Sequence, residues 1–295
     1  MRFPPLLIDF VFKHLFTTDR ISLNSLLSNI LYPDKSNSIE VIEILSIENS
    51  PTYHKAKNSL LDLKVRDKDG TIFQIELQLA EQISYIKRSL YYASTLLHNQ
   101  LKAGESYFKL SEVIQINILD FLIFPNQSII NWFLLKERTN PDLVLTEDLQ
   151  MIYIELPKFK KSTVEELNSG IDVWLYLLKY SQTLSEEDTM KLKNKLPDLK
   201  NAFGALELYA TDPEKQRQLE ERLRSDENLA YEMAAKYELG IEQGIEKGME
   251  QGIQKGEFKN KLETAWKMQE EGFSIEQIVR ITGLTLADLK NNGFI

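Results

Sequence analysis

Two acidic residues, Asp62 and Glu76, lie in neighbouring segments whose spacing would let the two carboxylates act together. Both segments alternate strictly between apolar and polar residues, LLDLKVR at residues 60–66 and TIFQIELQL at residues 71–79. Alternation with period two predicts β-strands with one apolar face. Because only DKDG separates the two segments, we expect a β-hairpin whose polar face carries both acids.

The length of the hairpin loop decides which residues oppose each other. A slip of one residue would move every side chain of a strand to its other face, so polar residues oppose polar residues only with a three-residue loop at 68–70. Such a loop places Gly70 at the left-handed bulge position that glycine favours. In this register Asp62 faces Glu76 directly.

Two carboxylates opposed in this way need a compensating partner. Directly opposite residues in a sheet have Cβ atoms about 4.5–5.5 Å apart, and like charges at that distance are destabilising. A salt bridge to a neighbour such as Lys64, simple exposure to solvent, or a shared divalent cation would each resolve the repulsion, and magnesium prefers such oxygen ligands. The hairpin alone leaves all three solutions open.

The elements around the hairpin predict an α/β arrangement on a small mixed sheet. Apolar residues at helical spacing predict two helices within residues 6–31. Further elements are expected as strands at residues 39–47, 113–124 and 151–156, a long helix at 81–104 that ends at Gly104, and a helical chain from about residue 162 onward. The final segment, 272–293, predicts two short helices around Thr282 and Gly283.

Composition excludes several classes of site. The chain has no cysteine, which excludes disulfide scaffolds, thiolate zinc sites and cysteine nucleophiles, and it has only three histidines. A net charge of −9 argues against a protein that coats nucleic acid, although it is compatible with a local phosphate site. The sequence shows neither a membrane span nor a signal-peptide pattern, so we expect a cytoplasmic protein with no membrane partner.

A repeat near the C-terminus, GIEQGIEKGMEQGIQKG at residues 240–256, places a glycine at every fourth position. On a helix these glycines form one stripe beside a row of isoleucine and methionine residues. Each glycine costs roughly 1 kcal/mol relative to alanine in a helix interior. We expect close packing against a second copy of the chain to offset this cost. Packing on helices of the same chain, or a flexible linker, are the alternatives.

The pattern of an Asp on one strand and Glu-x-Gln on the next, Asp62 with Glu76 and Gln78, resembles the core of the PD-(D/E)XK nucleases. Several other segments are similar to the Rpn family of bacterial recombination-promoting nucleases, or putative transposases. They are DFVFKHLF, RSLYYASTLL, QLKAGESYFKL, IELPKF and the glycine repeat. The resemblance runs over most of the chain.

The resemblance implies a restriction-endonuclease-like PD-(D/E)XK core with a small mixed sheet, followed by a helical C-terminal region. We expect a nuclease-like domain at residues 1–160, a helical region at 161–239, and an oligomerising region at 240–295. The implied activity is that of a magnesium-dependent endonuclease acting on double-stranded DNA in recombination, mobile-element or phage-defence biology.

The resemblance also implies the residues of the site. Asp62 and Glu76 correspond to the magnesium ligands, and the backbone carbonyl of Leu77 to a third ligand; Mn²⁺ or Ca²⁺ are possible substitutes in vitro. Gln78 stands where PD-(D/E)XK nucleases usually have a lysine that orients the attacking water. Glutamine can hydrogen-bond a water but brings no charge, and the Rpn family itself tends to carry glutamine here. Asp62, Glu76 and Gln78 are therefore the expected catalytic residues.

Four further residues are weaker candidates. Lys64 could supply the missing charge or simply pair with Glu76. Asp9 could approach the metal, or form an ordinary surface pair with Lys13 one helical turn away. Arg88 could contact a phosphate. Tyr92 could stack on a base or pack against the sheet.

Two other functions compete with the nuclease interpretation. The missing lysine is compatible with a nucleic-acid-binding protein whose active site is weakened or vestigial. The C-terminal repeat is compatible with an interaction protein in which the hairpin acids are only surface charge.

Overall fold

The computed structural model describes residues 3–45, 62–81 and 83–294, and for Asp62, residue 222 and residues 226–237 it describes the backbone only. The chain divides into two compact units, Met1–Gln216 and Arg217–Ile295. The division falls inside the expected 161–239 helical region, so the helices up to residue 211 belong to the same unit as the sheet.

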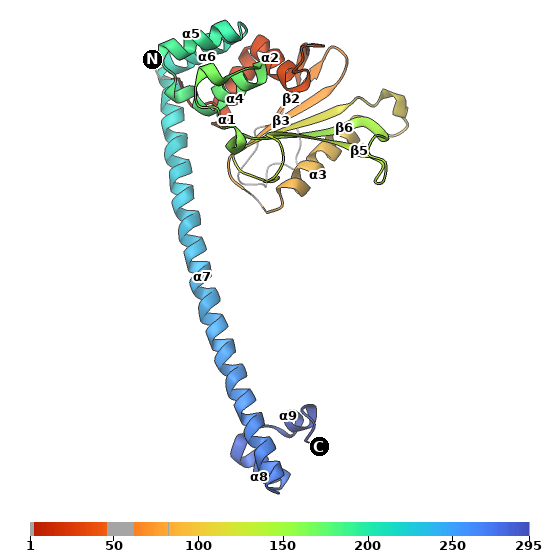
Figure 1. Ribbon diagram of the computed structural model, residues 1–295, viewed down its shortest axis with the longest axis vertical. Helices are drawn as coiled ribbons and strands as arrows, with labels where there is room; N and C mark the ends of the chain where they lie inside the picture. The colour runs from red at the N-terminus through yellow and green to blue at the C-terminus, as the bar shows by residue number, and fades with distance from the viewer. Residues whose placement is uncertain (1–2, 46–61, 82, 295) are drawn as a thin grey trace. The chain divides into compact units, whose positions relative to one another are not determined.

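The described part of the first unit contains a six-stranded mixed sheet in the order β1-β2-β3-β4-β6-β5 (Figure 1). β3 pairs with β4, and β4 with β6, in parallel, and the other pairs are antiparallel. The strands are β1 Val41–Leu45, β2 Asp62–Asp67, β3 Ile72–Gln78, β4 Val113–Leu119, β5 Ile130–Lys136 and β6 Val144–Glu155. This sheet, with helices packed on it, confirms the predicted α/β class.

The β2–β3 hairpin has the predicted register. Asp62 pairs with Glu76, and Gly70 has a φ of +92°, the left-handed conformation required by a three-residue loop. The Gly70 amide donates a hydrogen bond of 3.1 Å to the Asp67 carbonyl, which closes the turn. Residues 60 and 61, which we also assigned to the first strand, lie outside the described residues.

Three predicted boundaries were wrong. The helix expected at 81–104 is α3, Tyr85–His98, because the side chain of Gln100 turns away to bond both the amide and the carbonyl of Ser111. Gly104 has a φ of +87° in the loop that follows. The strand expected at 113–124 ends at Leu119, and the strand expected at 151–156 is the second half of β6. Strand β5 was not predicted.

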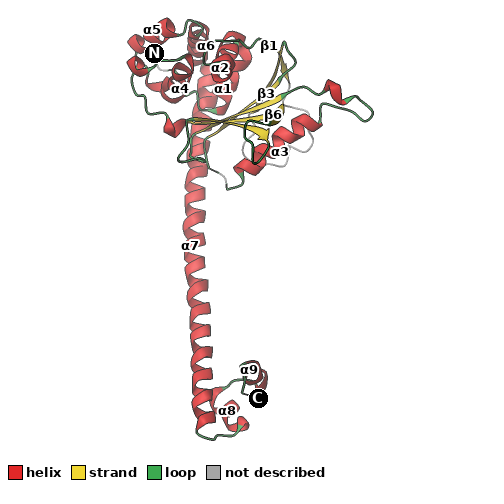
Figure 2. Cartoon of the chain, turned by 45° about the vertical axis from the view of Figure 1, so that its right-hand side comes forward, coloured by secondary structure: helices red, strands yellow, loops and turns green. Residues whose placement is uncertain are grey.

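Helices cover both faces of the sheet. Figures 1 and 2 show α3 on one face and the other helices of the first unit gathered on the opposite face. Those helices are α1 Asp9–Thr18, α2 Arg20–Leu31, α4 Gly170–Tyr180, α5 Glu186–Lys195 and α6 Leu199–Thr211. Short 3₁₀ turns lie at Tyr107–Lys109, Leu156–Lys158, Val164–Glu166 and Ser181–Thr183. The pair α1 and α2 confirms the prediction of two helices within residues 6–31.

Packing between α2 and α4 anchors the helical layer. Trp174 is fully buried and donates a hydrogen bond of 3.3 Å from Nε1 to Ser25 Oγ. Its ring lies 5.7 Å from the ring of Phe16, measured between centroids. A Cβ at Gly170 would lie 1.8 Å from Asn29 Oδ1, so a larger residue at this position requires the side chain of Asn29 on α2 to move.

The two faces of the sheet differ in chemistry. On β3, the side chains of Phe73, Ile75 and Leu77 share one face and those of Gln74, Glu76 and Gln78 share the other, and all of these residues are buried. The polar face is the one covered by α3, because Arg88 of α3 contacts Glu76 and Gln78 directly. A buried polar face needs internal partners for every group it carries.

A buried carboxylate holds the loop after β4 against the end of β6. Glu155 has no exposed surface and accepts hydrogen bonds from the amides of Ile123 (2.6 Å) and Phe124 (3.0 Å). Lys158 forms an ion pair with it and also donates to the Ser128 carbonyl at 3.2 Å. Burial alone would raise the pKa of Glu155, but the bonds from Lys158 and the two amides outweigh it and lower that pKa.

The second unit is built on one long helix, α7, Pro213–Glu270. At its C-terminal end, α8 Ile275–Thr282 and α9 Leu286–Asn291 form the predicted pair of short helices, with Gly283 in the left-handed conformation (φ +67°) between them. Their apolar residues pack on α7 in a small core of Ala265, Met268, Ile278, Leu284, Leu289 and Phe294.

The five glycines of the repeat lie within α7, and a Cβ added at any of them would meet no described atom within 4 Å. The neighbouring apolar row is exposed: Ile241 by 47%, Ile245 by 59%, Met249 by 64% and Ile253 by 59%. Within the second unit, therefore, no described residue packs against this stripe. None of the described helices has the length and apolar character needed to cross a membrane.

We predict that Glu155→Gln lowers the free energy of unfolding by about 3 kcal/mol at neutral pH, because it removes one partner of a buried ion pair. The lowered pKa of Glu155 means that this stabilisation is present above the pKa of the unfolded carboxyl, ~4.3, and is lost as the pH falls through the folded value. Urea unfolding of the full chain should therefore show a difference between the two proteins that shrinks on acidification.

Glu147→Gln, an exposed acid on the same strand, is the matched control and should change the stability by less than about 0.5 kcal/mol. Equal stabilities of Glu155→Gln and the parent protein at neutral pH would contradict the role given to Glu155.

Candidate functional site

A row of side chains crosses the polar face of the sheet. The strand register places Glu76 opposite Asp62 on β2 and opposite Asn117 on β4, and Asn117 opposite Tyr153 on β6. Residues opposite each other in a sheet point to the same face, so the expected pair of acids lies at one end of a continuous polar row. The position of Asp62 is given by its backbone alone.

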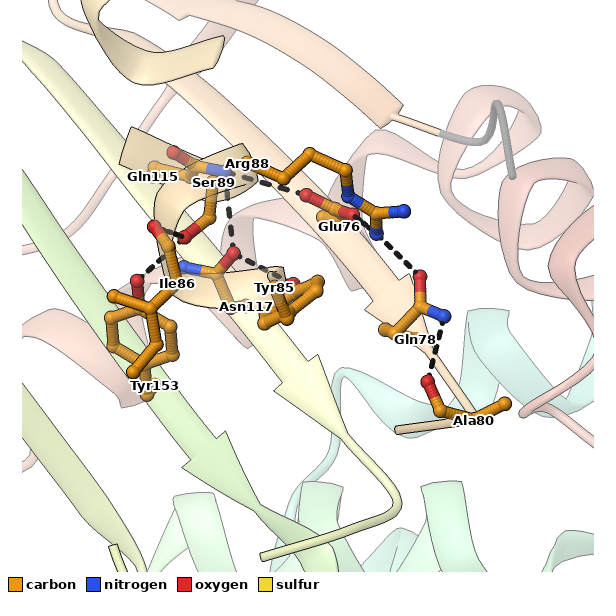
Figure 3. Close-up of polar contacts among 10 residues, drawn as sticks. All are labelled: Glu76, Gln78, Ala80, Tyr85, Ile86, Arg88, Ser89, Gln115, Asn117 and Tyr153. Carbon is orange, nitrogen blue, oxygen red and sulfur yellow. Dashed lines mark hydrogen bonds and ion pairs between the residues drawn. The ribbon is translucent and has the colours of Figure 1, made fainter. Parts of the chain in front are cut away.

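Glu76 is the buried acid at the centre of the site. Only 2% of its surface is exposed, and its two carboxylate oxygens have different partners (Figure 3). Oε1 accepts a hydrogen bond of 2.8 Å from Arg88 Nη2, and Oε2 accepts one of 3.4 Å from Gln115 Nε2. A buried carboxylate is costly unless it is paired and hydrogen-bonded, and the guanidinium of Arg88 provides the opposite charge.

Gln78 lies two residues further along the same face and is 6% exposed. Its side-chain carbonyl accepts a hydrogen bond of 2.7 Å from Arg88 Nη2, the same atom that contacts Glu76. Its amide nitrogen donates to the Ala80 carbonyl at 2.9 Å. The contact at each end fixes the orientation of the amide, with its oxygen toward Arg88.

Asn117 is the junction of the surrounding network. Its Oδ1 accepts hydrogen bonds from the Tyr85 hydroxyl at 2.9 Å and from Gln115 Nε2 at 3.2 Å. Its Nδ2 donates to the Ile152 carbonyl at 3.1 Å. All of these atoms are buried, so the network holds the side chains next to Glu76 in one arrangement.

A second contact fixes α3 over the sheet. Ser89 Oγ and the hydroxyl of Tyr153 lie 2.7 Å apart, and both residues are buried. Burial raises the pKa of Tyr153, and the negative charge of Glu76 raises it further, so the phenol is neutral at physiological pH. Because Ser89 follows Arg88 in the helix, this contact also fixes where the arginine side chain begins.

The structure brings together Glu76, Gln78 and Arg88, with Asp62 in register opposite Glu76. Leu77 lies between the two polar residues of β3, with its side chain buried on the opposite face. The sequence indicated Arg88 only as a weaker candidate, but its side chain contacts Glu76 and Gln78 directly. Lys64 lies one row away, in register with Gln74.

The described contacts of Asp9 and Tyr92 are with residues other than Glu76, Gln78 and Arg88. Asp9 begins α1, accepts a hydrogen bond of 2.6 Å from the Phe10 amide, and contributes to the raised pKa of Tyr209 on α6. That pKa is raised to about 12, first by burial and then by the charges of Asp212 and Asp9. Tyr92 is half-buried on α3, with its ring 6.0 Å from the ring of Tyr91.

Sequence reasoning missed the second polar strand of the site. Gln115 and Asn117 lie on β4 and are fully buried, and neither was considered. A signal was present, because VIQINIL at 113–119 places two amides on alternate positions of an otherwise apolar strand. Tyr85, Ser89 and Tyr153 carry no such signal, since isolated polar residues in amphipathic segments are common.

The groups at the site suit a hard divalent cation. The carboxylate of Glu76, the side-chain oxygen of Gln78 and the main-chain carbonyl of Leu77 are all oxygen donors, and Asp62 adds a second carboxylate at the opposite register position. Magnesium is commonly held by only one or two carboxylates, with water completing its shell. Within the described side chains no group of three or more His, Cys, Asp or Glu residues could hold a metal ion.

Comparison with known proteins identifies the family of the chain. A family described as PD-(D/E)XK nuclease family transposase matches residues 6–235, which include the whole sheet and all the residues of the site. No curated protein and no solved structure matches the chain. The match confirms the resemblance seen in the sequence and, with the mixed sheet, the PD-(D/E)XK fold class. This chain belongs to the PD-(D/E)XK nuclease family transposases.

Proposed function

We propose that this protein is a magnesium-dependent endonuclease that cuts double-stranded DNA. The observation that carries the proposal is the buried carboxylate of Glu76, in register with Asp62 and beside Gln78, in the region that matches a nuclease family. Arg88 balances the charge of Glu76, and a divalent cation would balance a second carboxylate in the opposite register position, at Asp62.

The chain's own groups have distinct roles in this proposal. Asp62, Glu76 and the Leu77 carbonyl hold the ion, and a bound magnesium supplies a water of lowered pKa and neutralises phosphate charge. The side chain of Gln78 hydrogen-bonds the attacking water. The attacking water loses a proton as its oxygen forms a bond to phosphorus, one phosphorus–oxygen ester bond breaks, and the departing oxygen takes up a proton. The amide network around Asn117 keeps these groups in place.

A DNA-binding protein with a weakened nuclease site is the second candidate. One observation favours it, because Glu76 is held by Arg88 and Gln78 carries no charge of its own. Under this alternative the protein binds double-stranded DNA and does not cut it. The family description points to DNA rearrangement, so recombination, mobile-element or phage-defence biology is the setting that we propose for either activity.

We also propose that two copies of the chain associate through α7. Exposed Ile241, Ile245 and Met249 line an open apolar groove on the helix, beside glycines where a second backbone could approach closely. A contiguous exposed apolar surface on a water-soluble helix is typical of an interaction site. Two copies would also supply two active sites, one for each DNA strand.

The charges along α7 favour an antiparallel arrangement of the two helices. Residues 238–250 of α7 carry four glutamates and one lysine, for a net charge of −3, and residues 251–263 carry three lysines and two glutamates, for a net charge of +1. Antiparallel pairing places each acidic half beside a basic half, whereas parallel pairing places like charges together.

Glu76→Gln and Asp62→Asn should each lower the cleavage of plasmid DNA in the presence of Mg²⁺ by at least about a hundredfold, the scale of losing one essential electrostatic group. Gel electrophoresis of nicked and linear products measures this loss. Cleavage by the parent protein should stop in excess EDTA.

Glu147→Gln is the matched control, because it removes an exposed acid of the same sheet. Cleavage that persists in both site variants would overturn the nuclease assignment. Binding of the parent protein to DNA in a mobility-shift assay, without any cleavage, would favour the second candidate.

Replacing two glycines together, Gly244→Gln and Gly248→Gln, should raise the helix content and weaken self-association at the same time. Glutamine is better than glycine in a helix by roughly 1 kcal/mol per position, and the monomer has open space for the new side chains. Circular dichroism and light scattering on the full chain measure the two effects.

The control for the glycine substitutions is Gln251→Ala, which lies on the polar side of the same helix. The association proposal fails if the parent protein is a monomer at micromolar concentration, or if the double variant keeps the same molecular mass as the parent.

A further inference from the structure

The guanidinium of Arg88 places a positive charge in contact with both polar residues of β3 that the site contains, Glu76 and Gln78. A single atom, Nη2, lies 2.8 Å from Glu76 Oε1 and 2.7 Å from Gln78 Oε1. Figure 3 shows the arginine reaching over the polar face from α3, with the guanidinium between the two β3 side chains. Arg88 retains 19% of its side-chain exposure, compared with 3% for Glu76, so it forms the solvent side of the pair.

Several contacts hold the arginine in this position. The ring of Tyr85 lies 5.0 Å from the centre of the guanidinium, at cation–π distance. The neighbouring Ser89 is docked on Tyr153, and the amide of Gln78 is turned by Ala80 so that its oxygen faces the guanidinium. The contact with Gln78 shows that the position of Arg88 does not depend on Glu76 alone. A neutral amide does not change the charge of the pair, so this contact serves to position the arginine.

Binding of a divalent cation by Glu76 competes with Arg88. Both are positively charged and both are attracted to the same carboxylate, so an ion bound to Glu76 weakens the attraction between Glu76 and Arg88 and favours release of the guanidinium. The hydrogen bond to Gln78 does not depend on Glu76 and can keep the guanidinium at the site. The N–H group that Glu76 releases can then turn to a phosphate oxygen, which the planar guanidinium suits.

We propose that Arg88 is the catalytic cation of this site. It neutralises Glu76 before a metal ion binds, and it then turns to the scissile phosphate and stabilises the negative charge that develops there, while Gln78 holds it in place. This inference rests on the proposed nuclease function. Lys64 is less suitable for this role, because it lies in register with Gln74, one row away from Glu76 and two rows away from Gln78.

The first test measures metal affinity without DNA. Titration calorimetry with Mn²⁺ should show that Arg88→Met binds the ion about tenfold more tightly than the parent, the scale on which one nearby charge shifts ionic equilibria at a buried carboxylate. Arg88→Lys should bind Mn²⁺ with nearly the parental affinity, because it retains the competing charge. If Arg88 had only a structural role, its loss would disorder the site, and Arg88→Met would bind Mn²⁺ more weakly than the parent.

The second test measures plasmid cleavage at a saturating concentration of Mg²⁺. Arg88→Met should lose about a hundredfold in rate, the scale of losing one preorganised donor to developing charge. The double variant Arg88→Met with Gln78→Lys restores an ammonium beside Glu76 and should recover at least about tenfold of that loss. A rise in Mn²⁺ affinity with a fall in cleavage, followed by recovery in the double variant, is the expected result.

Lys87→Met is the matched control, because it removes an exposed cation from the adjacent position of the same helix. The proposal is overturned if Arg88→Met cleaves DNA at the parental rate, or if it binds Mn²⁺ no more tightly than the parent. These outcomes differ from failure of the nuclease function itself, in which the parent protein cuts no DNA. Even then, the calorimetric test decides whether Arg88 competes with a cation for Glu76.

Discussion

The burial of one carboxylate, Glu76, sets the requirements that the surrounding structure meets. A charged group with 2% exposure in the middle of a sheet is stable only with an opposite charge and with hydrogen bonds to its remaining oxygen. Arg88 and Gln115 supply these partners from α3 and β4. Each of them needs support in turn, so polar residues extend from Glu76 across the sheet to Asn117 and Tyr153.

The contrast between the two sheet faces explains how the fold can carry this polar row. The apolar face, with Phe73 and Ile75, packs under the helical layer and provides most of the burial that stabilises the unit. Among the described helices, α3 covers the polar face, and it is joined to the sheet by hydrogen bonds and by the packing of Tyr85 with Leu119, Phe121 and Tyr153. A candidate site on a rigid strand beneath this helix has side chains in fixed positions, as the proposed chemistry requires.

The sequence predicted those parts of the fold that depend on interactions between residues close together in the chain. The register of the hairpin follows from side-chain parity and the turn preference of Gly70, and both operate within 17 residues (62–78). The end of α3 depends on a contact between Gln100 and Ser111, and the role of Arg88 depends on a helix packing onto a strand. Strand β5 and the first half of β6 are largely exposed, so they lack the alternation of buried and exposed residues on which sequence-based assignment relies. The family resemblance supplied the site residues on β2 and β3, but it did not indicate the charge that α3 brings to them.

The sequence of helix α7 contains residues that lower the stability of the helix. Its five regularly spaced glycines lower the stability of the helix by roughly 1 kcal/mol each, and no described atom of the chain uses the space that they leave. The apolar row beside them is about half exposed, so burial within the monomer does not offset the cost either. Because the glycines recur at every fourth residue, they form one continuous surface along the helix. This continuous surface supports the proposal that a second α7 approaches the helix backbone, with the more acidic half of each helix beside the more basic half of the other.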